Sequence, residues 1–124
     1  MRILLFATLL LLVPPAQAQD LLKPGDTITG KLRLVKTVHP SGTRINAYQI
    51  VPDNPRKFAK ADDFCGDDPP RTFHLVVMED KAKAAQLKKL LGRKITVVLD
   101  DFFCSETAWH IGEAVSFTWH FAPD

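Results

Sequence analysis

The chain has 124 residues, with 16 lysines and arginines against 14 aspartates and glutamates, so its formal net charge is only +2 at pH 7. A strong basic excess is the usual footprint of a nucleic-acid-binding protein, and this near balance argues against that class. The length suits one small domain behind a short leader segment.

The N-terminal segment has the layout of a secretory signal peptide. Arg2 precedes an apolar run over residues 3–13 in which Thr8 is the exception, two prolines end the run, and residues 16–18 read Ala-Gln-Ala. Small residues at these positions suit a signal peptidase, so cleavage is expected after Ala18. The run is shorter than the roughly 20 residues that cross a bilayer core. We therefore expect a periplasmic or secreted protein with no stable membrane insertion and a single domain over residues 19–124.

Two strands are predicted ahead of a long loop. Residues 27–34 alternate between apolar and polar side chains, as in a half-buried strand. Gly30 in this strand predicts a bend or a close backbone approach, and Val35 breaks the alternation as a β-bulge would. Residues 44–51 form the second strand. Residues 52–71 contain four prolines and predict a long irregular loop.

A third strand and a helix follow. Residues 72–78 alternate again, and the acidic pair at residues 79–80 predicts a helix N-cap. The helix is expected to run to about Leu91. Gly92 then ends it, because glycine adopts the positive φ that terminates many helices.

The final strands are predicted over residues 94–101 and 115–121, where the second of these alternates strictly. The predicted order is therefore β-β-β-α-β-β, a mainly β fold with one helix. A glycine-bearing first strand and a helix between the third and fourth strands fit an OB-fold-like five-stranded β-barrel. The alternative is an open α+β sheet with the helix on one face.

The two cysteines, Cys65 and Cys104, are expected to pair. Two cysteines in a small secreted domain usually form a disulfide, and their spacing excludes a C-x-x-C redox motif. The bridge would close a loop of about 40 residues and contribute roughly 4 kcal/mol in the chain-entropy model. Two free thiols are the alternative.

A short resemblance covers residues 87–115. Residues 87–97 read Leu-Lys-Lys-Leu-Leu-Gly-Arg-Lys-Ile-Thr-Val, and residues 107–110 read Thr-Ala-Trp-His. This Leu-Gly-basic helix-to-strand passage, followed by a Thr-x-x-His motif, resembles a domain-of-unknown-function family of small secreted bacterial proteins. That family has a run of histidines where only His110 matches here. The resemblance implies a periplasmic location and no particular activity.

Two loops supply the candidate binding surface. An aromatic residue in a polar loop is typical of a protein–protein anchor, although a Trp109 folded back over the barrel end is the alternative. The loop over residues 52–71 has an acidic half, which predicts a solvated turn or a surface for a basic partner. It lacks the ligand pattern of an EF-hand. The predicted surface consists of Trp109, His110, Glu113, Asp62, Asp63, Asp67 and Asp68.

Histidines offer a weaker metal hypothesis. His74, His110 and His120 could converge on a zinc ion if the third and fifth strands were neighbours. No short histidine spacing supports such a site, so no metal or other cofactor is expected. No nucleophile elbow, phosphate-binding glycine loop or carboxylate pair is recognisable either.

The sequence therefore favours a small periplasmic, non-enzymatic binding module. Its expected partner is another envelope or secreted protein, which it would bind or inhibit as an immunity protein or inhibitor does. One alternative is a small-ligand or metal-binding protein that uses the histidines, and another is an uncharacterised envelope hydrolase. The sequence leaves the oligomeric state open.

Overall fold

The computed structural model describes residues 20–123, so the predicted signal peptide over residues 1–18 lies outside the described residues. Within them, the chain is mainly β with a single helix, as predicted. The elements in chain order are β1 (Thr27–Val38), β2 (Arg44–Pro52), β3 (Phe73–Leu75), α1 (Lys81–Lys89), β4 (Lys94–Leu99), β5 (Phe103–Cys104), β6 (Ala114–Ser116) and β7 (Trp119–Phe121).

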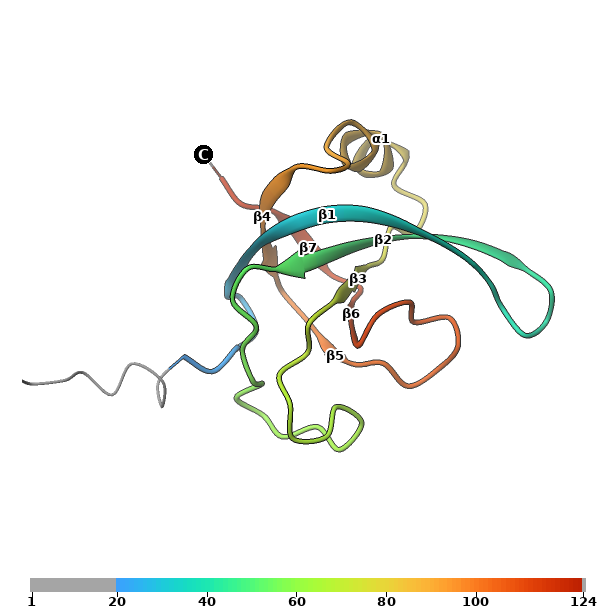
Figure 1. The fold of residues 1–124 in the computed structure, drawn as a ribbon. Helices are drawn as coiled ribbons and strands as arrows, with labels where there is room; N and C mark the ends of the chain where they lie inside the picture. Colours follow the sequence, from blue (N-terminus) through green and yellow to red (C-terminus); the bar gives the residue numbers. More distant parts are fainter. Residues whose placement is uncertain (1–19, 124) are drawn as a thin grey trace, which may run out of the picture.

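All strands belong to one mixed sheet with the order β5-β6-β3-β2-β1-β4-β7. Neighbours are antiparallel except β3 and β6, which are parallel. β6 and β7 lie near opposite ends of this order, yet only Phe117 and Thr118 separate them in the chain. The sheet must therefore curl, and it forms a half-barrel (Figure 1). This shape combines the predicted barrel with the predicted open sheet, but the described residues form seven strands where five were expected.

The long hairpin of β1 and β2 extends beyond the rest of the sheet (Figure 1). Its pairing is continuous from Gly30 opposite Pro52 to Val38 opposite Arg44, so the predicted bulge at Val35 is wrong. The predicted close approach at Gly30 is confirmed, because a Cβ atom there would lie 2.1 Å from the Val51 carbonyl oxygen. Only glycine fits this crossing of the two strands.

The predicted strand over residues 115–121 is interrupted by a corner. The Asp101 carboxylate accepts hydrogen bonds from the backbone N–H groups of Phe117 and Thr118, each at 2.9 Å. These bonds turn the chain between β6 and β7. The Phe117 side chain consequently lies in an exposed position rather than on the core face, because the period-two alternation stops at the corner.

The helix follows its local signals. The Asp80 side chain accepts a hydrogen bond from the Lys83 backbone N–H at 2.9 Å and caps the N-terminus of α1. Gly92 has a φ of +82°, as the predicted termination requires. α1 ends at Lys89, slightly before the predicted end at Leu91, and the predicted strand over residues 72–78 shortens to β3.

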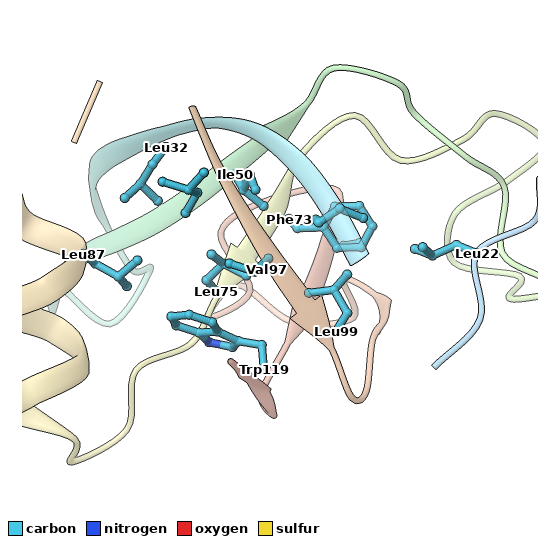
Figure 2. Packing of buried hydrophobic residues seen from close by; sticks show 12 residues of the cluster. Leu22, Leu32, Ile50, Phe73, Leu75, Leu87, Val97, Leu99 and Trp119 are labelled. Atoms are coloured by element: carbon cyan, nitrogen blue, oxygen red, sulfur yellow. The ribbon is translucent and has the colours of Figure 1, made fainter. Parts of the chain in front are cut away.

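The core fills the concave side of the half-barrel (Figure 2). Trp119, Phe73 and Leu87 are among its fully buried side chains, and each contributes roughly 1.5–3 kcal/mol by leaving water. At one end Leu87 brings α1 onto the sheet. At the other end Leu22 inserts from the N-terminal segment, whose backbone pairs with residues 57–59. The outer face of β2 and β3, opposite the core, binds the loop that contains Ile111.

Candidate functional site

A disulfide links the first predicted binding loop to the strand that leads into the second. Cys65 and Cys104 are paired, with 5.3 Å between their Cα atoms, so this prediction is confirmed. Cys65 lies in the loop between β2 and β3, whereas Cys104 is a buried residue of β5. β5 leads directly into the loop that carries Trp109. The bridge therefore holds two irregular segments at the same end of the molecule, opposite α1 (Figure 1).

The first segment, which we name the acidic loop, comprises residues 62–68. Asp62 stabilises the loop itself, because its carboxylate accepts hydrogen bonds from the backbone N–H groups of Phe64 and Cys104, at 3.0 and 2.9 Å. Asp63, Asp67 and Asp68 are exposed. The four predicted acidic residues therefore divide into one that fixes the loop against β5 and three that present negative charge to solvent.

Phe64 is the residue of the acidic loop that the sequence reasoning missed. Its side chain is 66% exposed, although it precedes the disulfide-bonded Cys65 directly. An aromatic residue between aspartates and next to a bridged cysteine is a signal that could have identified it. Exposure of so large an apolar side chain on a covalently restrained loop is typical of a contact surface.

The second segment, the Trp loop, comprises residues 105–113 and is held on the outer face of the sheet by two side chains. His74 and Gln49 lie opposite each other on β3 and β2. The Nδ1 atom of His74 accepts a hydrogen bond from the Ile111 N–H at 3.0 Å, and the Gln49 amide donates to the Ile111 carbonyl oxygen. Both backbone groups of Ile111 are thus bound, which satisfies polar groups in a partly buried setting.

The ionisation of His74 matches this role. Burial, together with the nearby His110, lowers the pKa of His74 from 6.5 to about 4. The ring is therefore neutral near pH 7, and its Nδ1 can accept the hydrogen bond from the Ile111 N–H. Protonation would replace an acceptor by a second donor and break this hydrogen bond.

Trp109 lies at the tip of the Trp loop and contacts the tip of the β1–β2 hairpin. Its ring stacks on His39, with 3.6 Å between ring centroids and an interplanar angle of 14°. The side chain is nevertheless 47% exposed. One face of the indole therefore packs on the hairpin tip, and the rest meets solvent.

His110 points the other way and supports the loop from inside. Its Nδ1 accepts a hydrogen bond from the Glu106 N–H at 3.0 Å, and its ring packs edge-on against Phe103 and Phe117. His110 is only partly exposed. It therefore stabilises the conformation that presents Trp109, and its place in the predicted binding surface stays a prediction.

Glu113 connects the bases of the two loops. Its carboxylate accepts a hydrogen bond from the Arg71 N–H at 2.6 Å, and its own N–H donates to the Thr72 hydroxyl at 2.9 Å. A groove of about 530 Å³ runs between the loops here. Phe64, Asp68, Arg71, Ser105 and Glu113 line it. The groove makes the acidic loop and the base of the Trp loop one continuous surface.

The three histidines proposed as metal ligands are not brought together. β3 and β7 are not neighbours in the sheet, because β2, β1 and β4 lie between them. His120 on β7 pairs instead with Asp100, with 2.8 Å between the ring nitrogen and the carboxylate. Across residues 20–123, no group of three or more histidine, cysteine, aspartate or glutamate side chains could hold a metal ion.

Comparisons with known proteins add no relative: no family model matches the chain, and neither a curated protein nor a solved structure matches it. The resemblance over residues 87–115 therefore stays a prediction. Among the described residues, no helix is long and apolar enough to span a membrane. The disulfide is compatible with an oxidising compartment.

Proposed function

We propose that this protein is a small periplasmic or secreted, non-enzymatic module that binds, and thereby inhibits, another envelope or secreted protein. The observation that carries the proposal is the pair of exposed aromatic side chains, Phe64 and Trp109, on two loops of which the first is bridged by Cys65–Cys104 to the strand that leads into the second. Large aromatic side chains at the centre of an interface commonly supply most of its binding free energy.

The restraint of both loops supports this proposal. The acidic loop is fixed by the disulfide and by Asp62, and the Trp loop by His74 and Gln49. Binding through loops that are already ordered avoids much of the entropy cost of association. The exposed carboxylates beside Phe64 favour a partner with a basic surface, because opposite charges accelerate encounter and select among partners.

Site-specific photo-crosslinking in the producing cells tests the proposal. A benzophenone amino acid replaces Phe64 or Trp109 in separate variants, and Ala85 on α1 serves as the control because it is exposed at the opposite end of the molecule. We expect both loop positions to give the same discrete protein adduct and the Ala85 position to give none. Absence of adducts, or equal adducts at all three positions, would contradict the proposal.

The partner identified in this way allows a quantitative check by calorimetry. Phe64→Ala and Trp109→Ala should each weaken binding at least about tenfold, as expected of interface anchors. Lys88→Ala, a surface change on α1, should leave the affinity unchanged. An affinity unaffected by both aromatic substitutions would exclude the two loops as the binding surface.

A further inference from the structure

A second surface lies along β2, whose outer edge is only partly covered. β3 pairs with β2 over Tyr48–Ile50 alone, so residues 44–47 pair only with β1 on the other side. The hydrogen bond from the His39 N–H to the Thr43 carbonyl, at 2.7 Å, shows that Thr43 directs its backbone toward the opposite strand of the hairpin. In an antiparallel pair this direction alternates from one residue to the next. Arg44 and Asn46 consequently point their backbone N–H and C=O groups outward, where residues 20–123 supply no backbone partner.

The edge of β2 at residues 44–47 is open because β3 pairs with β2 only as far as Leu75. Beyond Leu75 the chain no longer pairs with β2, although the Val76 N–H still donates to the Ser116 carbonyl at 3.0 Å and so continues the ladder with β6. The Val76 carbonyl in turn accepts from the indole N–H of the buried Trp119, also at 3.0 Å. Both backbone groups of Val76 are thus bound to β6 and β7, and no residue after Leu75 within residues 20–123 pairs with β2.

A groove occupies the space that a longer β3 would fill. It has a volume of about 650 Å³, and Tyr48, His74, Val77 and Met78 are among its lining residues. Met78 is 74% exposed, the largest exposed fraction among the large hydrophobic side chains of the described residues. Asn46 also borders a second hollow of about 380 Å³, so the depression continues along the strand. An apolar floor beside unpaired strand groups is the geometry that accepts an added strand.

The charges along the groove distinguish its two ends. The second hollow is lined by Lys36 and Arg44, which are exposed and form no ion pair within residues 20–123. Lys36 lies opposite Asn46 in the hairpin register, so both cations share the face that carries Tyr48. The end near Met78 has mixed charges from Glu79, Asp80 and Lys81. Charge complementarity therefore favours a ligand that places negative charge at the hairpin end of the groove.

We infer that the open edge of β2 at residues 44–46 binds an extended peptide segment of another protein as an added β-strand, with acidic side chains against Lys36 and Arg44 and apolar side chains against Tyr48 and Met78. This surface is separate from the exposed aromatic side chains Phe64 and Trp109, although His74 both lines the groove and binds Ile111 of the Trp loop. Backbone pairing supplies affinity in such complexes, and alternate side chains supply specificity.

The probe is the synthetic peptide acetyl-Glu-Thr-Glu-Thr-Val-Thr-Val-amide, tested with its reversed sequence because an edge pairs with either strand direction. The chain without its signal segment is titrated and followed by the NMR shifts and hydrogen exchange of backbone amides. We expect the Arg44 and Asn46 amides to shift and to exchange more slowly. A peptide with lysine in place of glutamate should bind at least about tenfold more weakly.

Asn46→Pro removes the outward N–H and leaves the pairing with β1 intact, since proline is tolerated on edge strands. It should weaken binding at least about tenfold relative to the matched variant Asn46→Ala, which keeps that donor. The double variant Lys36→Glu, Arg44→Glu provides a second readout and should reverse the preference between the glutamate and lysine peptides.

Three outcomes would overturn the inference. The first is that neither peptide direction shifts the amides at residues 44–46, or that both shift only the Trp loop. The second is equal binding by Asn46→Pro and Asn46→Ala together with an unreversed charge preference in the double variant. The third is concentration-dependent self-association that protects the same amides without peptide, which would make a second copy the occupant.

Discussion

His74 shows how one side chain links the fold to the candidate surface. Its imidazole lies on β3, and it accepts the hydrogen bond from the Ile111 N–H only while Nδ1 is unprotonated. The same geometry that seats the Trp loop also desolvates the ring and lowers the pKa of His74 to about 4. A histidine that is held neutral in the native state opposes folding in acid, because the unfolded chain takes up the proton more readily.

The pH dependence of stability follows from that shift. The unfolded pKa of 6.5 lies above the folded pKa of about 4, so the stabilising contribution is complete above pH 6.5 and is lost as the pH falls toward 4. We expect a loss of about 2 kcal/mol, below the full linkage value because the ring is partly solvated. Denaturant titrations of the wild type and His74→Gln across this range measure it. Parallel curves for the two proteins would show that another group dominates.

At the scale of elements, the corner between β6 and β7 explains where the sequence pattern misled. The alternation over residues 115–121 is what a continuous strand produces, and local periodicity carries no sign of a turn. The bonds that make the turn come from Asp101, which lies well upstream in the chain. The ends of α1 were predictable because Asp80 and Gly92 act on their immediate neighbours.

The same distinction separates the parts of the candidate site. The cysteine pair and the tryptophan were recognisable from residue type and the predicted compartment. Gln49 and His39 were not, because their partners Ile111 and Trp109 are distant in sequence and meet them only through the hairpin and the curl of the sheet. Polar side chains that clamp a loop have no local signature.

Removal of the hydrogen bonds that Asp101 accepts at the corner between β6 and β7 should lower the free energy of unfolding. Asp101→Ala leaves the N–H groups of Phe117 and Thr118 without their acceptor, and we expect a loss of about 2 kcal/mol in the free energy of unfolding. Asp100→Ala is the matched control, because Asp100 pairs only with an exposed histidine and should cost less than about 1 kcal/mol. Urea denaturation compares the two variants, and equal losses would assign the corner to packing rather than to Asp101.

At the scale of the whole molecule, the disulfide connects stability to the proposed binding surface. Cys65 and Cys104 are 39 positions apart, and the chain-entropy model assigns about 4 kcal/mol to closing a loop of that size. Most core side chains come from β1 to β4, β7 and α1, which the bridge does not touch. Opening the bridge should therefore lower stability while leaving the half-barrel assembled, and the largest change should fall on the acidic loop.

The double variant Cys65→Ser, Cys104→Ala tests this separation of roles. We expect its free energy of unfolding to fall by about 4 kcal/mol, in denaturant titrations compared with the oxidised wild type. Amide exchange should accelerate in residues 57–70 and change little at the centre of β1 and β4, because local openings follow the weakest contacts. Crosslinking from position 64 should decline more than crosslinking from position 109, since His39, His74 and Gln49 hold the Trp loop independently of the bridge. A uniform rise in exchange across the sheet would instead show that the bridge stabilises the whole fold and does not specifically position the acidic loop.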